Sequence, residues 1–465
     1  MVNSPGYGIT IRVEGNPTTD PVSSITTLLS GENASITGLD VVESSTDKVV
    51  VDVTCDTMDS EHAQRISKAL DEHPSLVVRK VSDRTFLLHL GGKIEIQSKV
   101  PLKNRDDLSR AYTPGVARIC QAIVEDHSNS RRLTIKRNSV AVITDGSAVL
   151  GLGNIGPEAA IPVMEGKAAL FKRFANVDAW PICLNTQDVD EIIRTVQIIS
   201  PIFGGINLED IASPRCFEIE NRLKEILDIP VFHDDQHGTA IVVLAALINS
   251  LKLVNKKIEE CKIIINGAGA AGTAIARLLV LNGAKNIIGF DRKGVINNKR
   301  SRDNKMREWF IENCNLDQFE GPLREAMKGA DVFIGVSGPN VLSEEDIKLM
   351  SSESIIFALA NPDPEIDPVI ARKYASIVAT GRSDQPNQIN NVLAFPGIFR
   401  GLLDANISKI TDHMLINAAV AIADCVSSEQ LNASYIIPSV FDQNVSIAVS
   451  KAVQSDPRKI KINSF

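Results

Sequence analysis

The pattern of hydrophobic and polar residues over the first ninety positions switches between the periods of strands and helices. Over 48–56, for example, every second residue is apolar, as in a strand with one buried face. The predicted segments are strands at Tyr7–Val13, Ile36–Glu43, Lys48–Asp56 and Leu76–Leu90, and helices from Pro21 and over Ser60–Glu72. We expect the last strand to be a hairpin that turns at Ser82 and Asp83. This βαββαβ order predicts a ferredoxin-like unit over residues 1–93.

The rest of the chain alternates short apolar runs with longer amphipathic stretches, which is typical of parallel sheets covered by helices. Strands are expected at Ser139–Thr144, Ala179–Leu184, Ile202–Asn207, Pro230–His233, Lys262–Asn266, Asn286–Phe290, Asp331–Val336, Ser354–Leu359 and Ile377–Ala379. We therefore predict an α/β protein in three parts, with a second unit over residues 94–245 and a doubly wound sheet over 246–465.

Composition and charge exclude several classes of protein. The 465 residues are 44% hydrophobic and 23% charged, as in proteins with ordinary globular cores. The net charge of −8 argues against nucleic acid or an anionic membrane as a partner, because both require clustered Lys and Arg. We expect neither a signal peptide nor a membrane span of ~18 apolar residues. The seven cysteines are scattered and form no C-x-x-C pair, which predicts a reducing, cytoplasmic location.

A glycine-rich turn follows the apolar strand at 262–266. Gly267 permits a tight turn, Gly269 lets a pyrophosphate approach the backbone, and Gly272 lets the next helix pack closely. That helix offers free N–H groups to phosphates. Asp291 lies 19 residues beyond Gly272, where an acid accepts hydrogen bonds from the adenosine ribose. The context predicts a nicotinamide-dinucleotide site. The candidate contacts are Gly267, Gly269, Ala270, Ala271, Gly272, Asp291 and Ser337.

The residue type at position 291 bears on the choice of coenzyme. An acid there repels the 2′-phosphate of NADP, so the prediction is NAD. Arg292 and Lys293 follow at once and offer a place for that phosphate, so NADP stays possible. A second glycine pattern at 151–156 is separated from its strand by Asp145-Gly146. It is interpreted as a turn against substrate or cofactor, with a purely structural turn as the alternative.

Two pairs of acids stand at the ends of predicted strands: Glu209-Asp210 and Asp234-Asp235. In open α/β sheets, ligands bind outside the carboxyl ends of strands. Converging carboxylates repel one another unless a cation lies between them, and an all-oxygen set suits Mg²⁺ or Mn²⁺. The alternatives are solvated surface acids, or a zinc site that uses His233 and His237 in the same loop.

Two further side chains are candidates for proton transfer. Lys167 lies on the apolar stripe of a helix predicted at Pro157–Phe174, and a desolvated lysine with a lowered pKa is a general base. The alternative is a lysine that reaches solvent from the edge of that stripe. Tyr112 precedes a Pro-Gly turn, and a phenol can act as a general acid. A packed turn tyrosine is its structural alternative.

Seven segments occur in a characteristic order: SRAYTPGVA, TDGSAVLGLGNIGP, EGKAALFKRFA, NLEDI, VFHDDQHGTAI, INGAGAAG and INNVLAFPGIFRG. Through these segments, residues 95–465 resemble the malic enzymes of bacterial type. The resemblance implies oxidative decarboxylation of malate to pyruvate and CO₂, with NAD or NADP and with Mg²⁺ or Mn²⁺. The first part, with ITGLDVV and DVTCDT, resembles ACT domains, which bind amino acids and regulate attached enzymes. A structural or dimerising unit is the alternative.

The resemblance also implies roles for individual residues. Tyr112 is the implied general acid and Lys167 the implied general base, with Asp234 supporting the lysine. The implied metal ligands are Glu209, Asp210 and Asp235, and the implied contacts to malate or nicotinamide are Asn361, Asn390 and Asn391. We expect a homodimer or a higher homo-oligomer with malate as its small-molecule substrate, and an amino acid or metabolite as effector of the first part.

One position departs from the larger members of this family. They carry an arginine before the LGLG turn that holds a malate carboxylate, whereas this chain has Ser147-Ala148, as shorter members do. The partner of the second malate carboxylate is therefore not assigned. Two other functions remain open: a metal-free hydroxyacid dehydrogenase, and a non-catalytic amino-acid sensor. Metal dependence and CO₂ release would separate the first of these from a malic enzyme.

Overall fold

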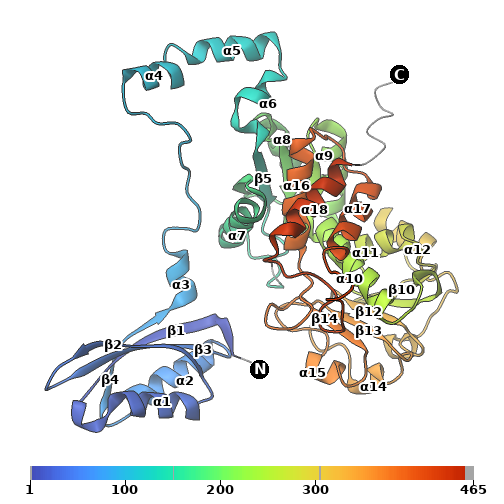
Figure 1. The fold of residues 1–465 in the computed structure, drawn as a ribbon. Helices are drawn as coiled ribbons and strands as arrows, with labels where there is room; N and C mark the ends of the chain where they lie inside the picture. The colour runs from blue at the N-terminus through green and yellow to red at the C-terminus, as the bar shows by residue number, and fades with distance from the viewer. Residues whose placement is uncertain (1–2, 150, 303–304, 456–465) are drawn as a thin grey trace, which may run out of the picture. The chain divides into compact units, whose positions relative to one another are not determined.

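The computed structural model describes residues 3–149, 151–302 and 305–455. The chain divides into two compact units, Met1–Glu95 and Ile96–Phe465, which we call the N-terminal and C-terminal units. Figure 1 follows them in colour from blue to red along the sequence.

The N-terminal unit is an antiparallel sheet of four strands in the order β2-β3-β1-β4, with helices α1 and α2 packed against it and a short third helix, α3, after the last strand. Ile25 of the first helix and Ile66 of the second are buried in one core with Val53 of the sheet. The predicted βαββαβ order of elements is confirmed. The elements are β1 (Ser4–Gly15), α1 (Pro21–Gly31), β2 (Ser35–Ser44), β3 (Val49–Thr57), α2 (Ser60–Asp71), β4 (Leu76–Asp83) and α3 (Arg84–His89).

The hairpin predicted within 76–90 is wrong, because β4 ends at Asp83 and α3 follows directly. The Asp83 carboxylate accepts hydrogen bonds from the backbone N–H of Thr85, at 2.8 Å, and of Phe86, at 3.1 Å. These bonds satisfy donors that the first turn of a helix leaves free. The aspartate that we took for a turn residue is therefore a helix cap.

The C-terminal unit begins with three helices and then forms a parallel sheet in the order β6-β5-β7-β8. The strand predicted from Ile202 begins later, because Ser200–Ile202 form a 3-10 turn. The elements are α4 (Arg105–Ala111), α5 (Val116–Glu125), α6 (Asn129–Leu133), β5 (Ser139–Thr144), α7 (Pro157–Ala175), β6 (Asp178–Cys183), α8 (Val189–Ile199), β7 (Gly205–Leu208), α9 (Arg215–Ile226), β8 (Val231–His233) and α10 (Thr239–Leu253).

A second sheet follows in the order β11-β10-β9-β12-β13-β14, parallel except for the short edge strand β11. The central position of β9, with strands added on both sides, is the predicted doubly wound plan. The elements are β9 (Lys262–Asn266), α11 (Ala270–Leu281), β10 (Asn286–Asp291), β11 (Gly294–Val295), α12 (Lys305–Asn313), α13 (Leu323–Ala326), β12 (Val332–Gly335), α14 (Glu344–Ile347), β13 (Ile355–Ala358), α15 (Pro368–Ala371), β14 (Ile377–Thr380), α16 (Phe395–Asp404), α17 (Asp412–Ala423) and α18 (Gln443–Gln454).

Helix α10 connects the two sheets through a shared hydrophobic core. All eight residues from 240 to 247 are buried, and the helix packs against both α11 and α17. By length and composition alone, Asp234–Leu253 would pass as a membrane span, but 72% of its apolar window is buried inside the protein. The apolar character of this helix is therefore explained by its position in the core of the C-terminal unit.

Candidate active site

The two acid pairs lie side by side because their strands are parallel neighbours. Leu208 of β7 pairs with His233 of β8, so the residues that follow each strand emerge at the same sheet edge. Ligand atoms of Glu209, Asp210 and Asp235 lie within 4.8 Å of one another. The backbone N–H of Asp210 also donates to Oδ2 of Asp235, at 2.9 Å.

Lys167 comes to this edge from α7. Its side chain is only 6% exposed, and Nζ lies 2.9 Å from Oε1 of Glu209 and donates to Asp234 as well. Nζ also lies 4.0 Å from the ring centroid of Phe395. The predicted inward direction of Lys167 is confirmed, and the lysine that reaches solvent is excluded.

The electrostatics of Lys167 differ from the expectation. Burial alone lowers the pKa of this lysine, but the charges of Asp234 and Glu209 outweigh burial and raise its pKa. We had expected a lowered pKa from desolvation, and that expectation is wrong for the protein without bound ligands. The sequence pattern showed the apolar stripe but not the two carboxylates that face it.

The carboxylates themselves are held in their neutral forms more readily than usual. Burial first, and then repulsion by Asp235 and Glu209, raise the pKa of Asp210 to about 9. Burial is also the main cause that raises the pKa of Asp234 and of Asp235, each to about 6. These directions are typical of buried carboxylates that lie close to one another, and the single charge of Lys167 does not offset them.

The cluster fits a divalent cation. Oδ2 of Asp210 and Oδ1 of Asp234 are buried and have no hydrogen-bond partner among the described residues. An oxygen-only set suits Mg²⁺ or Mn²⁺, and a cation beside these oxygens would also weaken their hold on the Lys167 proton. The zinc alternative is not supported, because His237 is engaged with Glu220 at 2.7 Å. Asp234, Asp235 and His237 lie on a π-helical turn, Asp234–Gly238, rather than in the predicted loop, and His233 is the last residue of β8.

A pH titration provides a test of the raised pKa values. An acid whose folded pKa exceeds its unfolded pKa favours the folded state at low pH and loses that contribution as the pH rises. We expect the metal-free protein to lose a few kcal/mol of unfolding free energy between about pH 4 and pH 9. Urea unfolding at several pH values in EDTA measures this. Saturating Mn²⁺ should flatten the dependence, and a metal-free stability that rises over this window would contradict the assignment.

Several residues that the sequence analysis did not single out support the cluster. Asn207 donates to Oε2 of Glu209 at 2.9 Å. Glu220 of α9 is buried and accepts hydrogen bonds from Gln236, at 3.2 Å, and from His237. These bonds anchor the π-helical turn that carries Asp234 and Asp235. The signal for such a contact, one more acid in a helical pattern, is too weak to be found in a single sequence.

The glycine-rich turn has the geometry of a phosphate-binding loop. Gly267 has a φ of +109°, and a Cβ there would lie 2.5 Å from the carbonyl oxygen of Val336. A Cβ on Gly272 would lie 2.3 Å from the carbonyl oxygen of Gly267, whereas one on Gly269 would meet nothing within 4 Å. Close packing thus requires glycine at 267 and 272. Gly269 instead faces open space in front of the α11 N-terminus.

The remaining cofactor candidates lie at the same edge of the second sheet. Asp291 ends β10, and Ser337 follows β12, where its hydroxyl accepts a hydrogen bond from Asn266 at 2.8 Å. The carboxylate of Asp291 is not free, because Arg300 and Arg307 both donate to it. Neither arginine was among the candidates from sequence.

The substrate candidates divide into two sets. Asn391 donates to Asp234 and so belongs to the lysine cluster. The Asn390 side chain instead caps a turn by accepting from the N–H of Val392, at 3.0 Å. Asn361 lies against the second glycine turn, since a Cβ on Gly151 would be 2.8 Å from the Asn361 carbonyl oxygen. Within the described parts of the chain, Asn391 is the one of these three asparagines with a hydrogen bond to the charged groups.

Tyr112 stands apart from the cluster. Tyr112 is the residue after α4 and is 69% exposed, and its hydrogen bonds to the residues that the structure describes are all made by its backbone. Among the described residues, none of the cluster contacts it. The geometry therefore supports a shared site for Lys167 and the carboxylates. Tyr112 could act at this site only if the segment that carries it changed its position.

A dinucleotide-type loop on one sheet, joined through a common core to a lysine and carboxylate cluster on another, is the arrangement of a metal-assisted dehydrogenase. Comparison with known proteins agrees. Residues 91–224 match the malic enzyme N-terminal domain, and residues 236–456 match the malic enzyme NAD binding domain. The chain belongs to the malic enzyme family.

Individual relatives extend this match over most of the chain. The NAD-dependent malic enzyme of Geobacillus stearothermophilus is 54% identical over 96% of this chain and 93% of that protein. The NADP-dependent malic enzyme of Rhizobium meliloti is 47% identical over 78% of this chain and 50% of that protein. The crystal structure of the NAD-dependent malic enzyme of Thermotoga maritima is 50% identical over 80% of this chain and 99% of that chain, with a TM-score of 0.77. The second sheet is thus a Rossmann-type NAD-binding domain.

Proposed function

We propose that this chain oxidises and decarboxylates (S)-malate to pyruvate with NAD, and that Lys167 and Tyr112 transfer the protons. The activity follows from membership of the family. The single observation that supports the residue roles is the buried contact of Lys167 with Asp234 and Glu209, beside a set of oxygens that suits a divalent cation. In a metal-free dehydrogenase these carboxylates would only repel one another, so their grouping would have no function.

In the proposed mechanism, Lys167 accepts the proton of the C2 hydroxyl of malate, and Asp234 holds the amine toward the substrate. Tyr112 donates a proton to C3 after CO₂ has left. Glu209, Asp210 and Asp235 would hold a divalent cation, which would supply Lewis-acid stabilisation of developing negative charge, and NAD would supply the hydride acceptor for C2. Asn391 fixes Asp234 from the other side.

The activity is tested by following reduced nicotinamide with malate and Mn²⁺, with NAD or NADP, with and without EDTA, and by assaying pyruvate. Metal-dependent reduction with one pyruvate per reduced coenzyme is the expected result. Reduction that yields oxaloacetate and no pyruvate would identify a simple dehydrogenase. No reduction with either coenzyme would favour the amino-acid sensor.

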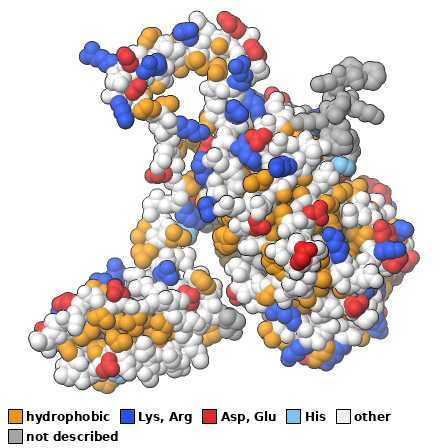
Figure 2. All heavy atoms as spheres, in the orientation of Figure 1, with side chains coloured by type: hydrophobic (Ala, Val, Ile, Leu, Met, Phe, Trp, Pro, Cys, Tyr) orange, Lys and Arg blue, Asp and Glu red, His pale blue; other side chains and the backbone are white. Residues whose placement is uncertain are grey.

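We also infer a homodimer. The segment around α4 and α5 exposes large apolar side chains, and Figure 2 shows hydrophobic atoms uncovered along it. Among them are Leu108, Val116, Ile119 and Val124, and α5 has no buried residue. Burying these side chains would stabilise an assembly by about 25 cal/mol per Å². Tyr112 lies on the same segment, so docking of the segment is what would bring its phenol to a lysine.

Mixing two inactive variants shows where the segment docks. We expect Tyr112→Phe and Lys167→Ala each to lack activity, and an unfolded-and-refolded mixture of the two to regain part of it if the tyrosine and lysine come from different copies. Recovery near one quarter of the wild-type rate is expected for random pairing with one intact site per mixed dimer. No recovery, with dimers confirmed by light scattering, would place both residues in one chain.

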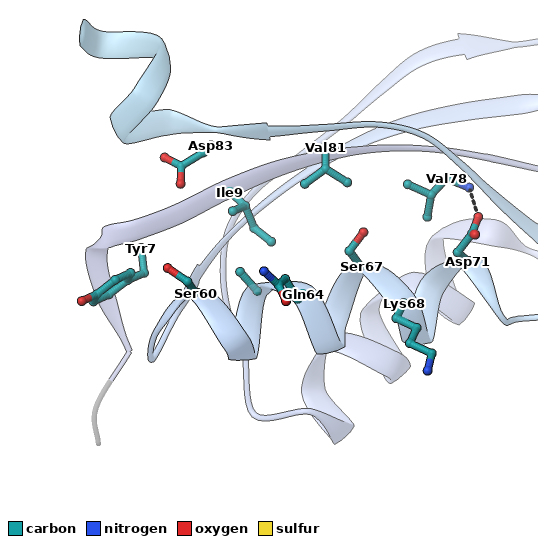
Figure 3. Close-up of a pocket in the computed structure, with 11 residues that line it drawn as sticks. Tyr7, Ile9, Ser60, Gln64, Ser67, Lys68, Asp71, Val78, Val81 and Asp83 are labelled. Carbon is teal, nitrogen blue, oxygen red and sulfur yellow. Dashed lines mark hydrogen bonds between the residues drawn. The ribbon is translucent and has the colours of Figure 1, made fainter.

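For the N-terminal unit we propose a regulatory role as an ACT-like domain over residues 1–93, ahead of a substrate domain over 94–245 and a dinucleotide domain over 246–465. A cavity of about 670 Å³ supports binding of a small ligand. Figure 3 shows Ile9, Val78 and Val81 of the sheet facing Ser67 of α2 across it. The lining combines apolar groups with hydroxyls and with Lys68, Asp71 and Asp83, which suits an amino acid.

The predicted cytoplasmic location accords with seven free cysteines.

Filling the cavity provides a test. We expect one or more of the twenty amino acids, screened singly, to raise the melting temperature and to change the malate rate. Ser67→Phe, which fills the cavity, should abolish both effects, while Arg65→Phe on the exposed side of α2 should keep them. A chain that responds to no amino acid, or a response that survives Ser67→Phe, would leave the unit as a structural appendage.

A further inference from the structure

A fully buried carboxylate lies at the carboxyl ends of β12 and β13. Oε1 of Glu365 accepts a hydrogen bond from the backbone N–H of Ser337, and Oε2 accepts one from the backbone N–H of Ala360, both at 3.0 Å. Ser337 lies in the loop after β12 and Ala360 in the loop after β13, and these two strands are parallel neighbours. One side chain therefore ties together the loops that leave two adjacent strands.

The packing around this carboxylate leaves room for it and fixes its position. A Cβ on Gly335, the last residue of β12, would lie 2.3 Å from Cδ of Glu365, so a larger residue would displace the carboxylate. The backbone N–H of Leu342 donates to the carbonyl oxygen of Glu365, at 3.0 Å. The hydroxyl of Ser337 accepts from Asn266, at the end of β9, where the glycine-rich turn begins. Glu365 is thus connected to three loops at one sheet edge.

The hydrogen bonds favour the ionised form of this acid. Both carboxylate oxygens accept from N–H groups, and protonation would turn one of these oxygens into a donor. Burial raises the pKa of Glu365, and the hydrogen bonds from the N–H groups of Ser337 and Ala360 oppose that rise. Within residues 3–149, 151–302 and 305–455, no lysine or arginine forms an ion pair with it. The charge therefore acts on groups that bind in front of the strands.

The topology of the second sheet indicates which part of a dinucleotide binds there. In a doubly wound sheet each half binds one mononucleotide, and the dinucleotide lies across the carboxyl ends of the strands. The glycine-rich turn follows β9, in the half with β10 and β11, whereas β12, β13 and β14 form the other half. The loops that Glu365 holds therefore belong to the nicotinamide half. The oxidised nicotinamide ring carries a positive charge, and the reduced ring is neutral.

We propose that Glu365 positions the two loops at the nicotinamide and that its buried charge favours binding of the oxidised coenzyme over the reduced one. Hydride transfer removes the positive charge of the ring, so the same carboxylate favours release of the reduced coenzyme after the reaction. The inference rests on the use of NAD in the proposed function. It does not depend on the roles of Lys167 or Tyr112.

Calorimetric titration of Glu365→Gln with NAD and with NADH tests the proposal. The substitution removes the charge and nearly keeps the shape. We expect the ratio of the Kd for NADH to the Kd for NAD to fall by about tenfold, the effect of one charge on another at about 10 Å inside a protein. The amide group of glutamine faces one of the two N–H donors, so both affinities should also fall. A change in loop position weakens both forms, whereas loss of the charge changes their ratio.

Asp363→Asn is the matched control, because Asp363 lies in the same loop and the substitution removes the same charge, but from an exposed side chain. Solvent screens such a charge, so the ratio should stay within about twofold of the wild-type value. Glu365→Asp keeps the buried charge on a shorter side chain. It should weaken both forms and leave the ratio within about threefold.

An unchanged ratio in Glu365→Gln would overturn the proposal, whether both affinities fall equally or neither falls. A tenfold change of the ratio in Glu365→Asp would overturn it even if Glu365→Gln fails to fold, and so would a tenfold change in Asp363→Asn. Failure of the wild-type protein to bind either form would refute the proposed function and this inference together. The ratio in Glu365→Gln concerns this inference alone.

Discussion

Replacing Lys167 with alanine is expected to lower kcat by about a thousandfold, the size of a general-base contribution. The affinity for NAD should change by less than about threefold. Lys167 lies at the edge of the β6-β5-β7-β8 sheet, where it contacts Glu209 and Asp234 and not the glycine loop. Single-turnover kinetics with malate and a calorimetric titration with NAD measure the two quantities separately.

Lys172→Ala is the matched control for this prediction. Lys172 lies on the same helix but points outward, is 54% exposed and pairs with Asp178. It should leave kcat within about twofold of the wild-type value, since exposed ion pairs contribute little. Retention of kcat in Lys167→Ala would remove the lysine from the mechanism. Loss of the fold is checked by the melting temperature in Mn²⁺, because the variant leaves two buried carboxylates without their cation.

Replacing Asp210 with asparagine is expected to separate stability from metal binding. Without metal, the variant should be at least as stable as the wild type at pH 8, because Asp210, with its pKa raised to about 9, ionises more readily in the unfolded chain than in the folded one, and a neutral asparagine removes this cost. Its affinity for Mn²⁺ should fall by about a hundredfold or more, and kcat with it. Asparagine suits this position because Asp210 has a φ of +53°, a conformation that Asn and Asp adopt more readily than other side chains.

Thermal melts with and without Mn²⁺ measure both effects. In the wild type, metal at a hundredfold excess over its Kd should add about 2.7 kcal/mol of stability, and Asp210→Asn should lose most of that gain. Asp190→Asn provides the control, because Asp190 is 79% exposed and pairs with Arg222 on the surface. An undiminished response to Mn²⁺ in Asp210→Asn would place the metal elsewhere.

The parts of this protein that the sequence predicted are those in which local pattern and tertiary structure agree. The central strand β9 is an apolar run, and Gly272 is required by a close backbone contact with Gly267, five residues before it. Lys167 was placed correctly because its neighbours on α7 define an inward stripe. These inferences depend on spacing along the chain, which a single sequence displays.

The parts that were missed depend on contacts between distant segments. The Lys167 pKa is raised by carboxylates 42 and 67 positions away, and no local pattern shows that they converge on it. Asp291 has the expected spacing from the glycine loop, but its arginines come from beyond β11. At Asp83, the residue type suits a turn and a helix cap equally, and only the following residues' backbone conformation decides.

Helix α10 has a consequence for recombination between members of the family. The turn that carries Asp234 and Asp235 continues directly into α10, which is buried from Ala240 to Leu247 and packs on α11 of the dinucleotide sheet. The boundary proposed at residue 245 falls in the middle of this helix. A chimera joined there would combine two half-helices and two unmatched core surfaces, whereas a junction beyond Leu253 keeps each helix whole. Exchange of coenzyme domains should therefore succeed only when the whole of α10 and the preceding Asp234 and Asp235 come from the same parent protein.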